Sequence, residues 1–436
     1  MTSERMLEIY SGLKEVIARR KTASVYTSLG YTSNLDLIPE FTSEDLNRLL
    51  AAYLPDACLR EMRPAGLIRN MPQLLETIVY YCLHGIGAEA DIEDPDLIRT
   101  GFPCRNAMGG TAVQAALALD RLGACSVVHL SDDSEEVRKQ LISPNIKVPV
   151  QGGLLGGAGD TAGGNFPETH VIIQFQKGSR ICLGEQVETI PASNRLILTR
   201  NTVNAFLPLD ENYLDWVETH AQQVSSNVLS SFNSILDPEV LKKRLARILE
   251  HVERYRRGNP QGIVYFEDAH YHSKESRRLC IETLYPHVDI MSMNEEELQY
   301  TMEMCHIPVE IDDIFSCVNG VEYLLDRFGM KRGVIVHTKD YAMYVGDASG
   351  LAIEKGMVYG SLMATARAAF GEYGSDAQIR KILEGSLSRV GLENLKKIEN
   401  SSLSGRVILV PTFALDRPKY TIGLGDCFTG GVQLCF

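Results

Sequence analysis

The sequence predicts an α/β protein with a central, mostly parallel sheet flanked by helices. Short apolar runs rich in Val and Ile alternate with longer helical patterns, and this alternation favours βαβ units. The runs are continuous rather than alternating, as expected of strands buried on both faces. They lie at Ser24–Leu29, Ser126–Ser131, His170–Phe175, Arg195–Thr199, Gly262–Glu267, Val288–Met293, Gly333–Thr338 and Val407–Val410.

The clearest predicted helix follows Asp237 and stops at Gly258. Asp is a good N-cap, Pro238 suits the first helical position, and Gly suits the end. The helix has one apolar stripe, which predicts that one face packs on the sheet. The stripe consists of Leu241, Leu245, Ile248, Leu249 and Val252.

Two regions interrupt the pattern of strands and helices. Residues 36–105 look polar and irregular, and residues 151–164 look like a glycine-rich loop. A strand pair is expected around Lys177–Gly178. These interruptions predict either a hairpin with a long entry or a small separate lobe over the main sheet.

Composition excludes several classes of function. The 436 residues carry a formal net charge of −13, which argues against a nucleic acid or an anionic membrane surface as the main partner. The ten cysteines form no C-x-x-C pair, so no zinc ribbon is indicated. There is no signal-peptide core and no apolar run of about 18 residues. We therefore expect a cytoplasmic protein with no membrane span.

The strongest motif is the glycine-rich segment Thr421–Gly431 (TIGLGDCFTGG). Glycines let backbone N–H groups approach an anion, and a helix start adds positive partial charge. Asp426 beside such an anion hole is placed to take a proton from a hydroxyl group. This combination is typical of phosphoryl transfer. The alternative interpretation is a glycine-rich turn in which Asp426 caps a helix.

Two further segments are candidates for binding a polar ligand. Gly109 and Gly110 open a small-residue helix, and their N–H groups can meet a ligand or simply allow close helix packing. Asn34 and Asp36, two apart on extended backbone, point the same way and can bind vicinal sugar hydroxyls, or form a turn at a strand end. Glu89 can add a third hydroxyl contact.

Acidic residues follow two predicted strands. Glu267 and Asp268 end one strand, and Asn294–Glu297 follows the next. Acids at the carboxyl edge of a sheet can hold Mg²⁺, usually through water. The alternatives are solvated turn acids and a helix capping box formed by Asn294 and Glu297.

Two basic residues are candidates for nucleotide binding. Arg195 opens a strand near the irregular region and can meet a phosphate. His337 ends the strand GVIVHT and can line a nucleotide site. The alternatives are a surface or packing arginine and a histidine that caps its strand.

Taken together, these motifs resemble the ADP-dependent glucokinase/phosphofructokinase family of the ribokinase-like superfamily. They occur in the family's order and span nearly the whole chain. The matching segments are Asn34–Asp36, Met108–Gly110, His170–Gly178, Asn194–Ile197, Asn294–Glu297, Val336–Thr338 and Pro418–Asp426.

The resemblance implies a ribokinase-like large domain and a smaller β-rich lid domain that closes over the sugar. Residues 1–35, 105–165 and 201–436 would form the large domain, and residues 36–104 and 166–200 the lid. It also implies transfer of the β-phosphate of ADP to glucose or fructose 6-phosphate, giving AMP. The partners would thus be ADP and a sugar or sugar phosphate.

The resemblance also assigns roles to single residues. Asp426 would be the general base, and the backbone from Gly423 through Gly425 to Asp426 the anion hole. Arg195, His337 and Gly425 would bind the nucleotide, and Glu267 and Glu297 would position Mg²⁺. The sugar hydroxyls would be held by Asn34, Asp36, Glu89, Gly109 and Gly110.

Some features leave alternatives open. Tyr265 stands where the family usually has His, and Phe413 where a basic residue is common. An ATP-dependent kinase of another alcohol and a sugar- or nucleotide-binding protein without catalysis are the alternatives. Glu89 favours glucose as the acceptor. The basic residues that can instead hold a sugar phosphate are Lys177, Arg180 and Arg200.

Overall fold

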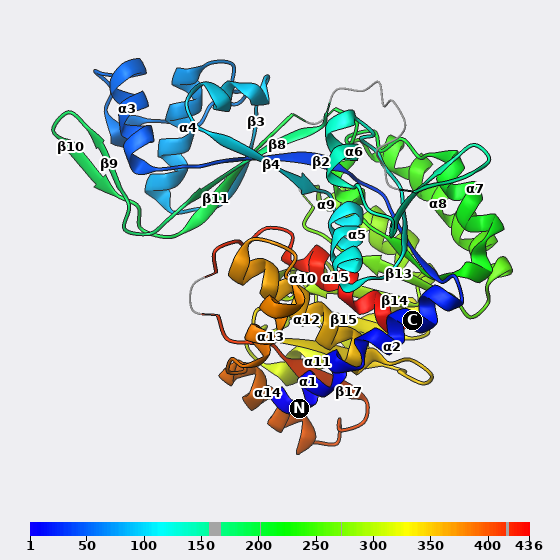
Figure 1. The fold of residues 1–436 in the computed structure, drawn as a ribbon. Helices are drawn as coiled ribbons and strands as arrows, with labels where there is room; N and C mark the ends of the chain where they lie inside the picture. The colour runs from blue at the N-terminus through cyan, green and yellow to red at the C-terminus, as the bar shows by residue number, and fades with distance from the viewer. Residues whose placement is uncertain (157–166, 201, 272, 416–417) are drawn as a thin grey trace.

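The computed structural model describes residues 1–156, 167–200, 202–271, 273–415 and 418–436. Within them, a ten-stranded sheet forms a large lobe, in the order β17-β16-β15-β14-β13-β12-β1-β5-β6-β7 (Figure 1). The strands from β15 to β6 in this order run parallel, and β16, β17 and β7 run antiparallel to their neighbours. Their bounds are β1 (Tyr26–Leu29), β5 (Ser126–Val128), β6 (Ile146–Val150), β7 (Gly153–Gly156), β12 (Val224–Leu229), β13 (Ile263–Glu267), β14 (Ile290–Asn294), β15 (Gly333–His337), β16 (Tyr341–Gly346) and β17 (Val407–Pro411).

Helices cover both faces of this sheet, which explains why its strands are apolar throughout. In β13, Tyr265 packs into one core, whereas Val264 and Phe266 pack into the other. The first core is closed by α1 (Ser3–Ser11), α2 (Leu13–Thr22), α5 (Thr111–Leu122), α6 (Glu135–Gln140), α12 (Ile353–Phe370), α13 (Asp376–Leu383) and α15 (Leu424–Val432). The second core is closed by α7 (Glu211–Thr219), α8 (Pro238–Gly258), α9 (Lys274–Leu284), α10 (Glu295–Met304), α11 (Ile314–Phe328) and α14 (Arg389–Glu399).

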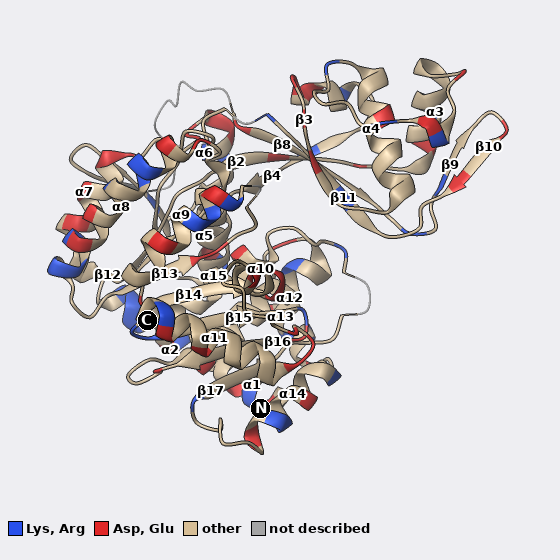
Figure 2. Ribbon diagram, turned by 180° about the vertical axis from the view of Figure 1, so that it is seen from behind, with Lys and Arg blue, Asp and Glu red and all other residues tan. Residues whose placement is uncertain are grey.

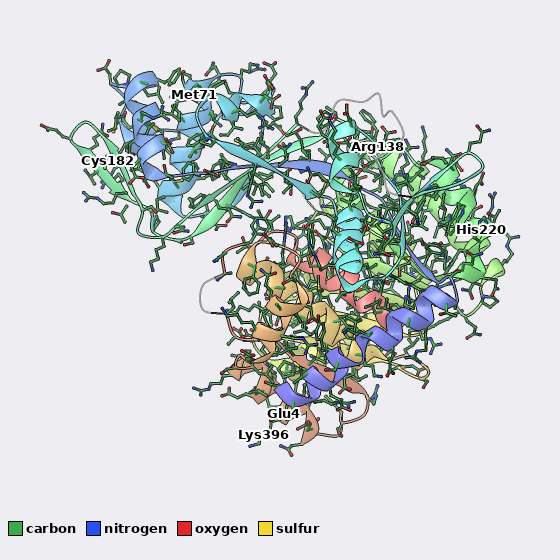
Figure 3. The ribbon with its side chains drawn as sticks, in the orientation of Figure 1. Glu4, Met71, Arg138, Cys182, His220 and Lys396 are labelled. Atoms are coloured by element: carbon green, nitrogen blue, oxygen red, sulfur yellow. The ribbon has the colours of Figure 1, made fainter. Side chains whose placement is uncertain are left out.

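A second, five-stranded sheet in the order β3-β11-β8-β2-β4 forms a small lobe beside the large one (Figure 1). One face of this sheet packs on two helices and a two-stranded hairpin in a separate apolar core. Met71 and Cys182 mark this lobe in Figure 3. Its elements are β2 (Asn34–Pro39), α3 (Ser43–Tyr53), α4 (Met71–His84), β3 (Ala88–Asp91), β4 (Cys104–Gly109), β8 (Thr169–Phe175), β9 (Arg180–Leu183), β10 (Gln186–Thr189) and β11 (Asn194–Thr199).

The predicted α/β class is confirmed, and each predicted strand occurs within two or three residues of its expected bounds. The predicted helix is confirmed as α8. Its N-cap is Asp237, whose side chain accepts hydrogen bonds from the N–H groups of Glu239 and Val240. Apolar periodicity and capping chemistry were therefore sufficient to locate these elements.

The expectation that residues 36–105 are irregular is wrong. They contain α3 and α4, which begin at the N-caps Thr42 and Asn70. The small lobe's strands are short, so their period-two pattern was hard to distinguish from a loop. The polar residues on the outer faces of α3 and α4 also made the segment resemble a loop.

The expected strand pair around Lys177–Gly178 is also wrong. Strand β8 pairs with β11 and β2, whereas β9 turns at Gly184 and pairs with β10. The turn near Gly178 thus passes the chain from the five-stranded sheet to a separate hairpin. In the segment predicted as a glycine-rich loop, Gly153–Gly156 is strand β7, and residues 157–164 lie outside the described residues.

Polar contacts hold the two lobes together where the chain passes between them. The hydroxyl of Ser33 donates to the Asp132 carbonyl (2.8 Å) and accepts from the Asp132 N–H (2.9 Å). The buried Glu168 carboxylate accepts hydrogen bonds from the N–H groups of Thr202 and Val203, each at 2.9 Å. These bonds fix the backbone on either side of the crossing points.

Charged residues of both signs are interspersed along α7 and α8 (Figure 2). Arg247 of α8, for example, pairs with Glu211 and Glu218 of α7 at 2.7 and 3.2 Å. Among the described residues, no helix combines the length and the apolarity that a membrane crossing requires.

Candidate active site

The candidate site lies at the carboxyl edge of the parallel strands, where ligands of open α/β sheets bind. Strand β13 ends at Glu267, β14 at Asn294 and β15 at His337. Because these strands are parallel neighbours, their ends meet at one edge. The start of α15 lies at the same place, since a Cβ added at Gly425 would lie 3.2 Å from the His337 ring.

Glu267 lies at the centre of this edge, and only 6% of the residue is exposed. One carboxylate oxygen lies 3.1 Å from Nε2 of His337, and the other accepts from the Thr429 hydroxyl at 2.6 Å. Burial opposes protonation of His337, but the Glu267 carboxylate outweighs it and raises the pKa of His337. A protonated His337 would form an ion pair with Glu267 under the first turn of α15.

The glycine-rich motif folds as predicted from its glycines, but Asp426 is not a helix cap. The N-cap of α15 is Gly423, at φ +66°, and no side chain caps the helix. Asp426 is the third residue of the helix. The first N–H groups of a helix have no partner within it, so Leu424, Gly425 and Asp426 present backbone donors at the site. That these donors form an anion hole stays a prediction.

The environment of Asp426 suits a proton acceptor. Burial is the main cause that raises the pKa of its carboxyl to about 6, and the Glu267 charge adds to it. A hydrogen bond from the Thr111 side chain and the charges of His337 and Arg367 act in the opposite direction. A carboxyl with this pKa is ionised at neutral pH and is more basic than an exposed aspartate.

The polar face of the small lobe's sheet lies opposite this edge. Side chains alternate along a strand, so residues two apart share a face. On the apolar face, Leu37, Val171 and Leu198 enter the lobe's core. The register places Asp36, Ala107, His170, Thr199 and Asp91 in one row on the other face.

Asn34, Asp36 and His170 form one cluster on this polar face. The Asn34 amide donates to Asp36 Oδ1 at 2.7 Å and lies 3.3 Å from His170 Nδ1. Burial raises the pKa of Asp36 to about 6, although His170 and Asn34 oppose the shift, and the charge of Asp426 contributes to it. Asp36 and Asp426, from two different lobes, are thus close enough to influence each other.

Gly109 and Gly110 lie between these two groups. A side chain at Gly109 would collide with Asn34 and Asp36, and Gly110, at φ +91°, would collide with the carbonyl of Thr32. Helix α5 begins at Thr111, directly after Gly110. Both glycines are therefore required for the close approach of β4, β2 and α5.

The acidic segment after β14 forms the capping box that was the alternative interpretation. Asn294 accepts from the N–H of Glu297, and Glu297 Oε2 accepts from the N–H of Asn294, each at 2.8 Å. Burial, followed by the charge of Asp268, raises the pKa of Glu297 to about 8, and Glu267 contributes. Among the described residues, no group of three or more His, Cys, Asp or Glu is arranged to hold a metal ion.

Arg277 forms hydrogen bonds with the acidic segments that follow β13 and β14. Its guanidinium donates to Asp268 Oδ2 at 2.9 Å, to the Ala269 carbonyl at 2.7 Å and to the Glu297 carbonyl at 3.1 Å. The Arg277 and Asp268 side chains are 0% and 1% exposed. This buried ion pair therefore holds the ends of β13 and the start of α10 together.

The structure brings most of the predicted residues together, but not all of them. Glu89 lies on the edge strand of the small lobe, on the same face as Asp36, and its charge helps to raise the pKa of His170. Arg195 is on that face too, four residues along β11 from Thr199, which is roughly 13 Å at the usual rise per residue. Among the described residues, its side chain forms no hydrogen bond or ion pair with the predicted nucleotide site.

Several residues of the site were not predicted. Thr111 follows Gly110 at a helix start, and Thr429 lies three residues after Asp426 on the same helix, so spacing was a usable signal for both. Arg367 is a charged residue inside an apolar helical pattern, which was a weaker signal. Arg367 and Asp426 are some 60 residues apart in the sequence, so the sequence around Arg367 did not indicate that it lies near the site.

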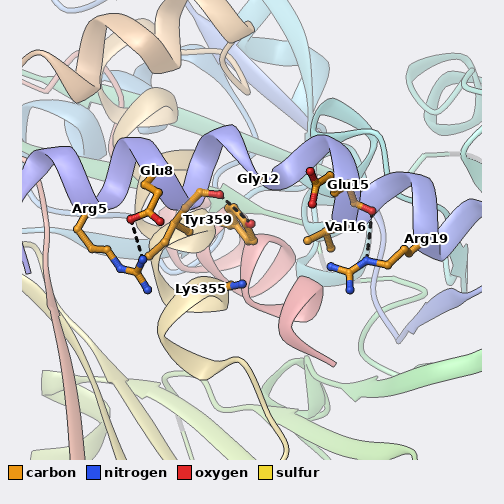
Figure 4. A pocket seen from close by; sticks show the side chains of 9 residues that line it. Arg5, Glu8, Gly12, Glu15, Val16, Arg19, Lys355 and Tyr359 are labelled. Atoms are coloured by element: carbon orange, nitrogen blue, oxygen red, sulfur yellow. Dashed lines mark hydrogen bonds and ion pairs between the residues drawn. The ribbon is translucent and has the colours of Figure 1, made fainter.

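Two surface hollows lie away from these residues. One, of about 210 Å³, is lined by residues of α1, α2 and α12, including Arg5, Lys355 and Tyr359 (Figure 4). The other, of about 640 Å³, lies in the small lobe beside the start of α3 and includes Gln174 and Arg180. Neither contains Asp426, Glu267 or Asp36, so the site is defined by its converging polar groups.

Comparison with known proteins gives consistent matches over the whole chain. The family model described as "ADP-specific Phosphofructokinase/Glucokinase conserved region" matches residues 27–432. The chain is 24% identical to an ADP-specific phosphofructokinase of Thermococcus zilligii, over 96% of each chain. It is 23% identical to an ADP-dependent glucose/glucosamine kinase of Pyrococcus abyssi, over 91% of each chain.

A solved structure also shares the fold. It is described as an ADP-dependent kinase complex with fructose-6-phosphate and ADPbetaS, and it superposes with a TM-score of 0.74 at 19% identity. The match covers 98% of this chain and 97% of that one. Both lobes are therefore part of the shared fold.

We predict that Arg277→Met destabilises the fold strongly. The substitution leaves the buried Asp268 carboxylate without its partner, so the free energy of unfolding should fall by about 3–5 kcal/mol in urea titrations. Arg254→Met removes an exposed partner of Glu218 and should cost no more than about 1 kcal/mol. Equal losses in the two variants would show that the buried pair has no special importance.

Proposed function

The chain belongs to the ADP-specific phosphofructokinase/glucokinase family, and on this premise we propose that it transfers the β-phosphate of ADP to a sugar hydroxyl. The acceptor is glucose or fructose 6-phosphate, and the products are AMP and a sugar phosphate. The relatives it matches carry both activities in their names, so the family alone does not choose the acceptor.

The observation that carries the proposal is the convergence of two carboxylates and a helix start. Asp426 lies in the first turn of α15, and Asp36 lies on the polar sheet face of the other lobe, within electrostatic reach. A sugar held by Asn34 and Asp36 would present a hydroxyl towards Asp426. The backbone N–H groups of the same helix turn would meet the phosphate that this hydroxyl attacks.

The reaction follows from this arrangement. Asp426 accepts the hydroxyl proton, and the oxygen attacks the β-phosphorus of ADP while the bond to the AMP oxygen breaks. The N–H groups of Leu424, Gly425 and Asp426 and the dipole of α15 stabilise the charge on the transferred group. In this reaction the protein contributes mainly positioning and electrostatic stabilisation.

Glucose is the acceptor that the small lobe favours. Glu89 and Asp91 on β3 and Asp36 on β2 make the polar face of the sheet rich in carboxylates. A carboxylate beside the sugar accepts hydrogen bonds from hydroxyls but repels a second phosphate. Of the cations that could offset this repulsion, Lys177 and Arg180 lie at the turn leading to the β9–β10 hairpin. Arg105 and Arg195 share the polar face with Asp36, but they are outnumbered there by the carboxylates.

Mg²⁺ is part of the proposal because carboxylates gather at this edge, where two of them and the nucleotide phosphates would share the ion in place of a site built from three protein ligands. Glu267, Asp268 and Glu297 are crowded there, and their mutual repulsion helps to raise the pKa of Glu297. Glu267 and Glu297 would hold the ion, with water and nucleotide phosphates as the remaining ligands. When bound, it would neutralise charge on the phosphates.

Two residues depart from the family pattern, and both have a structural role in the core. Tyr265 and Phe413 are both buried in the core on the α15 side of the sheet. The Tyr265 hydroxyl lies 3.5 Å from Glu267 Oε2, so it supports that carboxylate. Neither residue blocks Asp426, and a protein that only binds its ligands is therefore the weaker alternative.

A coupled assay that crosses ADP and ATP with glucose and fructose 6-phosphate tests the proposal. We expect turnover with ADP, AMP as a product, and a higher kcat/KM for glucose than for fructose 6-phosphate. Turnover with ATP and none with ADP would identify the alternative kinase. Sugar binding without turnover at saturating Mg²⁺ would identify a binding protein.

We predict that Gly109→Ala weakens sugar binding. The new methyl group would collide with Asn34 and Asp36, and overpacking of this kind costs about 1–3 kcal/mol. The KM for the sugar should rise about 10- to 100-fold, whereas the KM for ADP should change little. Gly66→Ala in the same lobe is the matched control, because nothing lies within 4 Å of the added atom.

We predict that Glu297→Gln raises the Mg²⁺ concentration needed for half-maximal activity by about 10- to 100-fold. Gln keeps an oxygen for the capping box, so the melting temperature should change little. Glu296→Gln makes the same change of charge at an exposed neighbour and should have no such effect. An unchanged Mg²⁺ requirement in Glu297→Gln would leave that residue with a capping role alone.

A further inference from the structure

Tyr420 is placed at a contact between the two lobes. The guanidinium of Arg105, on β4 of the small lobe, lies 5.6 Å from the centre of the Tyr420 ring. The guanidinium of Arg367, on α12 of the large lobe, lies 4.3 Å from the same centre. A guanidinium near the face of an aromatic ring is attracted by the negative charge of that face. Two cations from different lobes thus share one tyrosine.

The large-lobe side of this contact is fixed in place. Tyr420 is 3% exposed and Arg367 is 4% exposed. The N–H groups of Lys419 and Tyr420 both donate to the Ala368 carbonyl, at 2.8 and 3.2 Å. Arg367 also lies 4.6 Å from the Tyr373 ring centre, and its Nη1 donates to the Gly371 carbonyl at 3.1 Å. The Tyr420 ring therefore has a fixed position relative to the end of α12.

The small-lobe side of the contact is exposed. Arg105 is an exposed residue and, among the described residues, it forms no ion pair. It lies opposite Ile38, two residues along the strand from the pair of Ala107 and Asp36, so it shares the polar face with Asp36. Attraction to the Tyr420 ring thus links Arg105 to the large lobe.

Both partners lie just ahead of catalytic elements in the chain. Arg105 is the second residue of β4 (Cys104–Gly109), which leads into α5 at Thr111, and the Thr111 side chain forms a hydrogen bond with Asp426. Tyr420 precedes Gly423 by three residues and Asp426 by six. A contact between Arg105 and Tyr420 therefore ties the strand that packs against Asp36 to the segment that carries Asp426.

We propose that Tyr420 is a positioning residue that aligns the Asp426 segment with the small lobe through its contact with Arg105. The ring acts on the reaction through Asp426 and does not touch the reacting atoms. The effect on turnover rests on the proposed kinase function, whereas the contact between the lobes does not. The experiment therefore needs one measurement of each kind.

Four variants distinguish the role of the Tyr420 ring from that of its hydroxyl, and the role of Tyr420 from that of Arg105. Tyr420→Leu removes the ring, Tyr420→Phe keeps the ring and removes the hydroxyl, and Arg105→Gln removes the cation. Arg105→Gln combined with Tyr420→Leu tests whether the two act through one contact. Arg69→Gln is the control, because Arg69 is an exposed arginine of the same lobe that pairs with Glu93.

The first measurement is steady-state kinetics at saturating ADP with glucose and with fructose 6-phosphate. Arg105→Gln and Tyr420→Leu should each lower kcat about two- to fivefold, as expected for loss of one exposed contact of this kind. The sugar KM should change less than about threefold. The double variant should be no worse than Tyr420→Leu, and Tyr420→Phe should recover most of the lost turnover.

The second measurement is hydrogen exchange of the backbone amides in residues 418–427 of the full chain without substrates. Arg105→Gln should speed this exchange several-fold, although Arg105 is distant in sequence and exposed. Arg69→Gln should not. Because this measurement needs no turnover, it still tests the contact if the wild-type chain proves to lack kinase activity. Arg105→Gln also remains informative if Tyr420→Leu does not fold.

Three outcomes would overturn the proposal. Unchanged exchange in Arg105→Gln would show that the contact does not hold the Asp426 segment. A Tyr420→Phe variant as impaired as Tyr420→Leu would assign the role to the hydroxyl instead of the ring. A loss in Arg105→Gln that is confined to the KM for fructose 6-phosphate would make Arg105 a ligand of the sugar phosphate.

Discussion

The crowding of carboxylates at one edge of the parallel sheet is the constraint on which the rest of the site depends. Glu267, Glu297, Asp426 and Asp36 are brought within reach of one another by strand ends, a helix start and the facing lobe. Charges of one sign can be packed so closely only if others offset them. Arg277 and Arg367 supply positive charge, His337 and His170 lie beside the carboxylates, and the first turn of α15 supplies backbone donors. Acidic side chains and unpaired backbone donors therefore lie next to each other at this edge.

The same arrangement shows that capping and catalysis are compatible roles for one segment. Glu297 closes a capping box with one oxygen, and yet its carboxyl lies in the acidic cluster with a raised pKa. Asp426, in contrast, is not a cap at all, because Gly423 occupies that position. A residue that caps a helix, such as Glu297, can therefore also belong to a functional site. Its neighbours in the folded structure determine whether it has one role or both.

Much of the large lobe could be predicted because its signals are local. Strands buried on both faces appear as continuous apolar runs, and α8 carries its own cap at Asp237. The glycine-rich segment and the pair Asn34 and Asp36 also show their chemistry within a few residues. The small lobe could not be predicted in the same way, since its sheet is assembled from short strands far apart in sequence. Contacts such as Asn34 with His170, or Arg367 with Tyr420, exist only after folding.

The most direct test of the account is the turnover of Asp426→Asn. Asn keeps the shape and hydrogen bonding of the side chain but cannot accept the hydroxyl proton. We expect kcat to fall by about 10²- to 10⁴-fold, while the dissociation constants of glucose and ADP and the melting temperature stay close to those of the wild type. Asp237→Asn, at the remote cap of α8, should leave kcat unchanged. A kcat near the wild-type value in Asp426→Asn would contradict the account, because it would remove the proton acceptor on which the proposed reaction depends.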